Sequence, residues 1–385
     1  MVQEVTTQSW GSRIISAFWG ILAGIALIVG SFILVFWNEG HGLHTAQSLE
    51  QTEKVVTTAP NSPIDQKNNH HAIYFSGRAI TDNTLHDALF DISEKAIKLN
   101  RKVEMYQWEQ HTETSTQKQM GGSEQETKTY TYKTVWSDKL IDSSDFKDKT
   151  GHENPESMPI NSKSQEAKNV TVGDFVLPGD LISQMSGETP VDLSKIDLSK
   201  IESKTKKPVK LEEKEIYVGD DSTTPKVGDL RITVSEILPQ VVSIIAEQAD
   251  QTLQPFTPPA GEPVSLLVMG HHSPAQMISD AKSQNQMILI ALRIASLIIM
   301  IIGMALLMKP IVVLADVIPL FGNIVGMGTG LIAFITGLIL WTIATSIAWF
   351  AFRPLWAVGL ILIVAGTCFL ILSSRKRNKI IKPAK

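Results

Sequence analysis

The chain has 385 residues, 43% of them hydrophobic, with a formal net charge of −4. Its basic residues neither form one patch nor alternate with aromatic residues, which excludes a nucleic-acid-binding protein. Cys368 is the one cysteine, so no disulfide can form within the chain.

The first predicted element is a membrane helix. Residues 1–13 are short and polar, and residues 14–37 that follow carry no charge. About 20 apolar residues cross a hydrocarbon core of roughly 30 Å, so residues 14–37 are long enough to span a membrane. The run exceeds the roughly 7–15 residues of a signal-peptide core, and no small-x-small cleavage site follows. We therefore expect this helix to be retained.

Residues 38–286 predict a large β-rich α+β domain outside the membrane. Residues 40–67 read as an extended lead-in, and apolar residues at helical spacing predict a helix over 81–100. Alternating aromatic and β-branched residues predict a hairpin of 102–109 with 130–136, joined by a long polar loop. Further strands are expected at 169–177, 228–234, 241–246 and 265–269, the second and third of them paired, and residues 274–286 are expected to be helical.

The last hundred residues predict three more membrane helices, at 287–308, 324–350 and 355–372. Lys309-Pro310 ends the first of them, and residues 309–323 form a cytoplasmic or re-entrant loop. Residues 373–385 are a basic cytoplasmic tail. The fold class is therefore a multi-pass α-helical membrane protein of four spans, with the β-rich domain between spans 1 and 2.

The distribution of basic residues predicts the orientation of these helices. With four spans, Arg13, Lys309 and the basic tail fall on one side, and only Arg353 falls in the short opposite loop. The positive-inside rule then makes both termini cytoplasmic and puts residues 38–286 in a periplasm or lumen. Glycosylation at Asn169-Val170-Thr171 would report entry into a secretory lumen.

Four glycines are candidates for helix packing. Gly20 and Gly24 form a small-xxx-small pair in the first span, and Gly326 and Gly330 form another in the third. Such pairs let helix backbones approach closely, which predicts a packed bundle or a homo-oligomer. The alternative is the ordinary enrichment of glycine in membrane helices.

Four polar residues lie in or next to the apolar segments: Arg293, Asp316, Asn323 and Arg353. Arg293 is expected to extend to the head groups along its aliphatic stem. Asp316 at mid-bilayer would cost roughly 2.5–3.5 kcal/mol, which favours a solvated side chain in the loop. The sharper alternative is a re-entrant loop that lines a cavity or contacts a partner.

The sequence contains no assembled reactive group. Two histidine pairs, His70-His71 and His271-His272, lack the spacing of a known zinc motif. No Gly-x-Ser-x-Gly elbow is present, and the carboxylates are scattered. We therefore predict a protein that is not an enzyme and that holds no metal or cofactor.

Six motifs resemble the transmembrane protein 43 (LUMA) family, in order and at similar spacing over nearly the whole chain. They are Phe36-Trp37-Asn38-Glu39-Gly40, Val103-Glu104-Met105-Tyr106-Gln107-Trp108, Tyr130-x-Tyr132-x-x-x-Trp136, Gly151-His152-x-Asn154-Pro155, Val227-Gly228-Asp229-Leu230-Arg231 and Phe352-Arg353-Pro354-Leu355-Trp356-Ala357. The resemblance implies four spans, a large lumenal or external domain and no known catalysis. Animal members are associated with protein complexes at the endoplasmic reticulum and inner nuclear membrane, including emerin and lamins, and with self-association.

The favoured function is a membrane scaffold that recruits or organises other proteins through its external domain. Its expected partners are membrane lipids, further copies of the chain, and other membrane or external proteins. A channel or transporter-like assembly using Arg293, Asp316 and Asn323 is the alternative, and a membrane-bound hydrolase is the weakest hypothesis. The Lys-, Asn- and Ile-rich composition favours a bacterial member in the cytoplasmic membrane; a eukaryotic member would lie in the endoplasmic reticulum or inner nuclear membrane.

Overall fold

The computed structural model describes residues 2–353 and divides into two compact units. The fourth predicted span, residues 355–372, and the basic tail, 373–385, lie outside the described residues. The β-rich unit comprises Met1–Thr7, Gln47–Gln117 and Gln125–Ala281, and the helical unit comprises Gln8–Ala46, Lys118–Glu124 and Lys282–Lys385.

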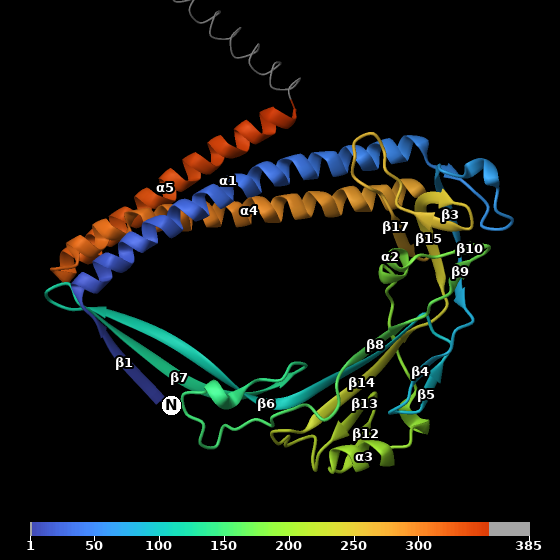
Figure 1. Cartoon of the computed structure of the whole chain (residues 1–385), viewed down its shortest axis with the longest axis horizontal. Helices are drawn as coiled ribbons and strands as arrows, with labels where there is room; N and C mark the ends of the chain where they lie inside the picture. The colour runs from blue at the N-terminus through green and yellow to red at the C-terminus, as the bar shows by residue number, and fades with distance from the viewer. Residues whose placement is uncertain (1, 354–385) are drawn as a thin grey trace, which may run out of the picture. The chain divides into compact units, whose positions relative to one another are not determined.

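Three long helices supply the candidate membrane segments among residues 2–353: α1 (Trp10–Val55), α4 (Pro274–Ala315) and α5 (Pro319–Phe352) (Figure 1). Each is long and apolar enough to cross a membrane. They contain the first three predicted spans, and all three helices extend beyond them. A membrane protein with several apolar helices and a large β-rich portion is therefore confirmed.

Two predictions about the ends of these helices are wrong. The expected lead-in over 40–67 is helical as far as Val55, because no proline interrupts the chain before Pro60. The expected break at Lys309-Pro310 lies inside α4. Proline is tolerated in membrane helices where neighbouring groups satisfy the freed carbonyl, and Pro319 occupies the first position of α5, where proline is favoured. Most of the predicted loop at 309–323 is thus helix, and only residues 316–318 form a turn.

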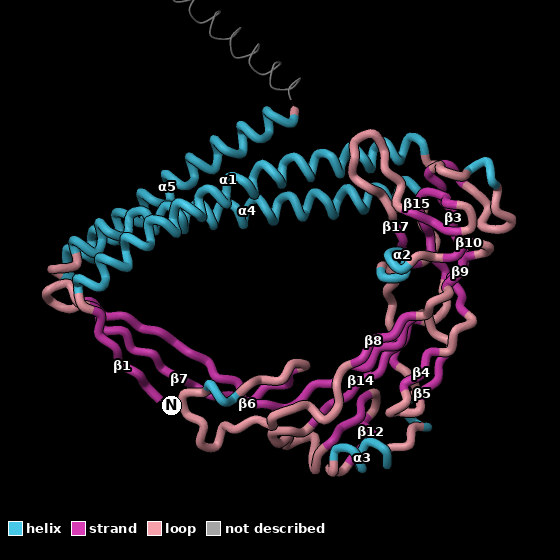
Figure 2. The backbone as a smooth tube through the Cα atoms, viewed as in Figure 1, coloured by secondary structure: helices cyan, strands magenta, loops and turns pink. Residues whose placement is uncertain are grey.

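One sheet of the β-rich unit is built around two long neighbouring strands, β6 and β7 (Figure 2). Its order is β1-β7-β6-β14-β13-β12, with β11 beside β14 and β8 beside β6. The bounds are β1 (Val2–Gln8), β6 (Lys98–Lys118), β7 (Glu124–Ser137), β8 (Lys163–Glu166), β11 (Thr189–Pro190), β12 (Val209–Glu212), β13 (Glu215–Val218) and β14 (Leu230–Ile237).

A second sheet has the order β17-β15-β16-β10-β9-β3-β2, with β15 also paired to β3. The same hydrophobic core includes Phe75 of β3, Val103 of β6, Ile232 of β14 and Ile244 of β15, so both sheets contribute to it. The remaining bounds are β2 (Thr57–Thr58), β3 (Ala72–Thr81), β9 (Val170–Val172), β10 (Phe175–Val176), β15 (Val241–Ala249), β16 (Thr252–Gln254), β17 (Leu266–Met269), α2 (Gly179–Ser183) and α3 (Ser199–Thr205).

The predicted helix over 81–100 is wrong. This stretch forms the hairpin of β4 (Leu85–Asp87) with β5 (Ile92–Glu94) and then enters β6. The Asp87 carboxylate accepts a hydrogen bond from the Leu89 amide, and Asp91 has a φ of +54°. Aspartate favours such turns through its side chain, so local turn chemistry overrode an apolar spacing that fits a helix.

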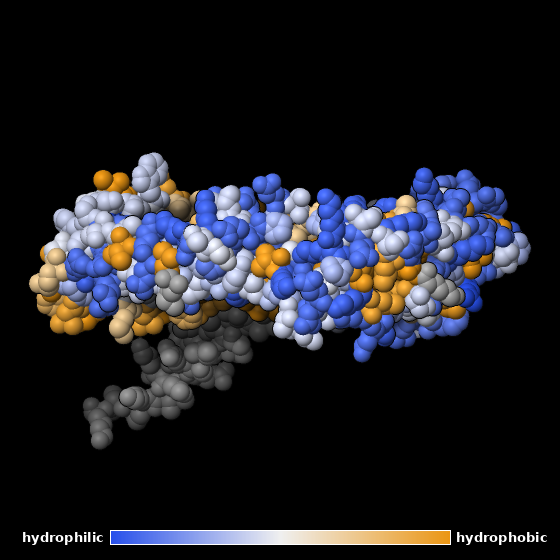
Figure 3. Space-filling model, turned by 90° about the horizontal axis from the view of Figure 1, so that it is seen from below, coloured by the Kyte–Doolittle hydropathy of each residue, from blue (hydrophilic) through white to orange (hydrophobic). Residues whose placement is uncertain are grey.

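The predicted strands are largely confirmed, but one pairing is wrong. Strands β6 and β7 form the expected hairpin, although most of the expected polar loop is strand. Strands β14 and β15 follow one another in sequence yet lie in different sheets, β14 against β6 and β15 against β3. The connection at 238–240 contains Pro239 and no glycine, so it does not provide the turn of a tight hairpin. The molecular face in Figure 3 is mostly hydrophilic, with hydrophobic residues in separate patches.

Candidate functional site

A buried charged cluster lies at the start of α1, within the helical unit. Arg13 is 6% exposed, and its guanidinium donates to the Gly122 carbonyl (2.6 Å) and to the Asp316 carboxylate (2.5 Å). Glu124 lies 2.8 Å from the same guanidinium, and Lys118 lies 2.8 Å from the other Asp316 oxygen. Two cations and two carboxylates thus form a neutral group, the Arg13 cluster.

The turn of the β6–β7 hairpin supplies part of this cluster. Gly121 and Gly122 have φ values of +88° and +81°, a conformation that favours glycine. The Gly121 amide donates to the Val317 carbonyl in the α4–α5 turn (3.0 Å). A Cβ on Gly122 would lie 2.3 Å from the ring of Trp10, whose indole N–H donates to the Val313 carbonyl (2.9 Å). The hairpin turn, the start of α1 and the α4–α5 turn are therefore held together.

The position of Asp316 corrects the expectation of a solvated side chain. Asp316 is fully buried. Its two carboxylate oxygens face Arg13 and Lys118 respectively, and these cations offset the cost of removing the carboxylate from water. The segment consists of two helix ends joined by a short turn, and the re-entrant alternative stays a prediction.

A second buried cluster involves Glu39 of α1, which sequence reasoning had not selected. Glu39 is fully buried, and its carboxylate accepts from Arg293 Nε at 2.5 Å and from Arg353 at 3.4 Å. The neighbouring Asn38 side chain donates to the Leu289 carbonyl (3.0 Å). Both residues could have been selected from the sequence, because Asn38 and Glu39 directly follow an uncharged run. We call this group the Glu39 cluster.

The four predicted polar residues do not form one site. Arg293 and Arg353 share Glu39, so Arg293 has a protein partner instead of the expected head group. Asp316 belongs to the Arg13 cluster, and Asn323 is exposed on α5. Arg293 and Asp316 are separated by 23 residues, or roughly 34 Å along a helix that rises about 1.5 Å per residue.

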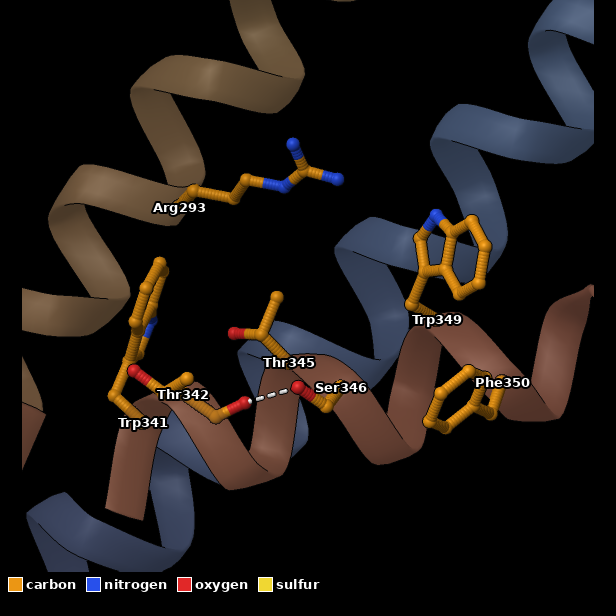
Figure 4. Close-up of a pocket in the computed structure, with 7 residues that line it drawn as sticks. All are labelled: Arg293, Trp341, Thr342, Thr345, Ser346, Trp349 and Phe350. Atoms are coloured by element: carbon orange, nitrogen blue, oxygen red, sulfur yellow. Dashed lines mark hydrogen bonds between the residues drawn. The ribbon is translucent and has the colours of Figure 1, made fainter. Parts of the chain in front are cut away.

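A cavity of about 340 Å³ lies beside Arg293, between α4 and α5 (Figure 4). The α5 residues that line it are three aromatic and three hydroxyl side chains. The Ser346 hydroxyl donates to the Thr342 carbonyl, and the Trp341 indole donates to Ser296 of α4 (2.9 Å). The lining residues are Arg293, Trp341, Thr342, Thr345, Ser346, Trp349 and Phe350.

The predicted packing glycines have different surroundings. A Cβ on Gly24 would lie 2.8 Å from the Gly303 carbonyl oxygen of α4, so the two backbones approach closely there. Gly20 and Gly326 have looser neighbours, the nearest at 3.9 Å and 3.5 Å, and nothing described lies within 4 Å of Gly330. Gly303 lacked a small partner four residues away in its own helix, and sequence reasoning therefore missed it.

Comparison with known proteins gives the family. The model of the family "Transmembrane protein 43" matches residues 105–354. This chain belongs to the transmembrane protein 43 family. The human Transmembrane protein 43 is 30% identical over 371 residues, covering 93% of this chain and 90% of the human protein. The rat protein is 29% identical over 350 residues (88% and 86%), and the Drosophila melanogaster homolog 28% over 267 residues (67% and 69%). No solved structure matches.

The motifs that resemble the transmembrane protein 43 family meet in space. Glu39 and Arg353, from the motifs at 36–40 and 352–357, form the ion pair described above. In the β-rich unit, Arg231 pairs with Glu104 (2.7 Å) and lies over the Trp136 ring, its guanidinium carbon 4.9 Å from the ring centre. Three further motifs are therefore joined by one arginine.

The same part of this transmembrane protein 43 family member contains a buried carboxylate, Asp229. It accepts from the Tyr217 hydroxyl (2.7 Å) and the Lys207 ammonium (2.8 Å). Burial and the Asp229 carboxylate raise the pKa of Tyr217, which stays protonated as the donor. Asn154 fixes a neighbouring loop by accepting from the Trp108 amide and donating to its carbonyl. These hydrogen bonds give the motif residues a structural explanation.

Among residues 2–353, no group of three or more His, Cys, Asp or Glu side chains could hold a metal ion. His271 contacts the Ser76 hydroxyl (2.8 Å), whereas His70 lies 3.5 Å from Glu247. The two histidine pairs thus have separate local partners. Their arrangement in this family member offers no metal centre in the described part of the chain.

Proposed function

We propose that this chain is a membrane scaffold that presents its β-rich unit to other proteins. The support is the way in which the helix ends take part in that unit. Leu49 of α1 packs with Met277 and Ile278 of α4 and with Ile245 and Val264, all within the β-rich unit, forming the junction core. The ends of α1 and α4 are therefore packed parts of the β-rich unit.

Hydrogen bonds extend this junction. The Gln51 side chain accepts from the Ala260 amide (2.9 Å), and the Ser48 hydroxyl accepts from the Glu262 amide (3.1 Å). A unit packed in this way loses little internal conformational freedom when a partner docks, which lowers the entropic cost of association. This property suits a recruiting role.

Proximity labelling tests the scaffold. A biotin ligase inserted between Glu213 and Lys214, in the exposed turn after β12, should biotinylate a reproducible set of proteins. The control is the same ligase anchored by an unrelated membrane helix on the same side. A labelled set indistinguishable from that control would contradict the scaffold.

Self-association is the second part of the proposal. Among residues 2–353, nothing lies within 4 Å of a Cβ added at Gly330 of α5, whereas Gly24 is already packed against α4, so we propose that α5 offers its small-residue face to a second copy. The channel alternative has weaker support, because Arg293 and Asp316 have opposite charges as partners in separate clusters. Purified protein in liposomes that conducted ions would restore it.

The compartment proposed from composition is a bacterial cytoplasmic membrane. The four-span arrangement with both termini cytoplasmic and residues 38–286 outside follows from the basic residues. The described residues hold three helices that are long and apolar enough to cross a membrane.

A further inference from the structure

The Glu39 cluster of the helical unit carries an excess positive charge. One fully buried carboxylate, that of Glu39, serves two guanidiniums, those of Arg293 and Arg353. Two cations and one anion leave one positive charge, whereas the Arg13 cluster holds two of each and is neutral. Among residues 2–353, no second carboxylate pairs with Arg293 or Arg353. A charge in an apolar segment is costly unless an opposite charge lies beside it, so this cluster favours the approach of an anion.

Arg293 is the member of this cluster that borders a cavity. Its side chain is 32% exposed, and it lines the cavity of about 340 Å³ between α4 and α5. Figure 4 shows the side chain extending from α4 toward the space above Thr345 of α5. The volume falls at the lower end of the roughly 300–1,000 Å³ of small-ligand sites, which suits a compact group such as a phosphate with its glycerol.

Thr345 supplies a hydroxyl group that the described residues do not use. Its Oγ1 atom is buried and has no hydrogen-bond partner among them. The other hydroxyl side chains of α5 each donate to the carbonyl four residues earlier; they are Thr329, Thr336, Thr342 and Ser346. Threonine has two accessible χ1 rotamers in a helix, so the Thr345 hydroxyl can turn to a ligand. A buried oxygen without a partner is unfavourable, and a ligand in the cavity would satisfy it.

The surroundings of the cavity favour a lipid over a soluble ion. Helices α4 and α5 are long and apolar enough to cross a membrane. Ile343 and Ile347, next in sequence to two of the hydroxyl residues that line the cavity, are 48% and 52% exposed, so acyl chains can cover them. Trp349 lies three residues before the end of α5 at Phe352. Tryptophan prefers the membrane–water interface, which is the level of the lipid head groups.

From these observations we infer that the cavity binds the phosphate head group of an anionic phospholipid. Arg293 uses its Nε for Glu39, which leaves its two terminal nitrogen atoms to donate to two phosphate oxygens. The Thr345 hydroxyl donates to a further oxygen of the same phosphate. An anionic lipid brings the negative charge that the Glu39 cluster lacks, whereas a phosphocholine lipid adds a second cation beside Arg293. Lipid binding at this cavity does not depend on the scaffold proposal.

Native mass spectrometry of the full chain in detergent, titrated with one lipid at a time, tests this site. Phosphatidylglycerol should bind more tightly than phosphatidylcholine with the same acyl chains. Thr345→Val keeps the shape of the side chain and removes an oxygen without a described partner, so the variant should fold and lose about fivefold in phosphatidylglycerol affinity. Thr336→Val is the matched control, because Thr336 lies on the same helix and does not line the cavity; its affinity should be unchanged.

Arg293→Gln tests the charge at the same site. The variant leaves Glu39 paired with Arg353 alone, so it should lose about tenfold in phosphatidylglycerol affinity and with it the preference over phosphatidylcholine. Thermal unfolding of each variant ensures that folded chains are compared. Equal affinity for the two lipids in the unaltered chain, or unchanged binding in Thr345→Val, would overturn the inference. Displacement of the lipid by inorganic phosphate would show that the cavity takes a soluble anion, and would overturn the assignment to a lipid.

Discussion

At the scale of single residues, the charges in the apolar segments are explained by partners distant in sequence. Arg293 could be selected from the sequence alone, whereas the role of Glu39 became clear only from its contact with Arg293 in the fold. Desolvation of an unpaired charge is expensive, so each of the two clusters stabilises the helical unit only as a complete set. Removal of one member of a cluster should therefore lower the free energy of unfolding by more than the loss of a surface ion pair does.

Glu39→Gln tests this cost. The change leaves Arg293 and Arg353 without a negative partner and should lower the free energy of unfolding by about 3–5 kcal/mol. Thermal unfolding in detergent measures the effect. The matched control on the same helix is Glu50→Gln, which removes an exposed pair with Lys54 and should cost less than about 1 kcal/mol. Equal stability of the two variants would contradict a structural role for the Glu39 cluster.

The pH dependence of β1 docking follows from Glu4. Hydrogen bonds from the Lys147 ammonium and the Tyr130 hydroxyl lower the pKa of Glu4 below the usual value of a glutamate. A lowered carboxyl pKa gives stability that is present above the unfolded pKa and lost as the pH falls through the folded one. We expect hydrogen exchange of residues 2–8 to accelerate below about pH 4.5.

Glu4→Gln is the control for this titration, because its amide does not ionise in the same range. In that variant, exchange of residues 2–8 should be faster at neutral pH and nearly independent of acidification. An unchanged acid response in Glu4→Gln would mean that another group controls the docking of β1.

At the scale of elements, the sequence predicted membrane helices and strands better than their ends and partners. Apolar length identified three helices, alternation identified β6 and β7, and β14, β15 and β17 were also expected as strands. The helix predicted at 81–100 failed because apolar spacing cannot exclude a hairpin when Asp87 and Asp91 favour turns. The pairing of β14 with β15 failed because adjacency in sequence says nothing about a change of sheet.

The glycines give an element-scale prediction with an internal comparison. Gly24→Leu would place side-chain atoms against the Gly303 carbonyl and Leu306, so it should disrupt packing of α1 on α4 and lower yield in detergent. Gly330→Leu adds a side chain where the described residues leave open space. This variant should keep the fold intact while weakening self-association. Size-exclusion chromatography with light scattering separates these outcomes. An unaltered oligomer in Gly330→Leu would remove α5 as the self-association face.

At the scale of the whole molecule, the candidate site was only partly predictable. The membrane character and the family were readable from the sequence. The Arg13 cluster was not, because its members lie in three segments separated by more than a hundred residues each. The orientation rule used the positions of basic residues and took each apolar run as a crossing; the pairing of β1 with β7 supplies information that no such rule contains.

The junction core gives a prediction at this scale. Leu49→Ala removes a buried side chain that packs on both helices and sheet, and should cost about 2–5 kcal/mol. Leu211→Ala, at a side chain that is 37% exposed in β12, should cost much less. Denaturant unfolding, followed by the intrinsic fluorescence of the β-rich unit, compares the unfolding midpoints of the two variants. Similar midpoints would contradict a stabilising role for the junction core.

The Arg13 cluster has a consequence for biosynthesis. Asp316 follows Arg13 by 303 residues, so a ribosome makes the arginine and Glu124 long before the second carboxylate exists. Until translation approaches completion, Arg13 and Lys118 have only Glu124 as a carboxylate of the cluster. Prematurely terminated products would retain this excess positive charge, which distinguishes them from finished chains.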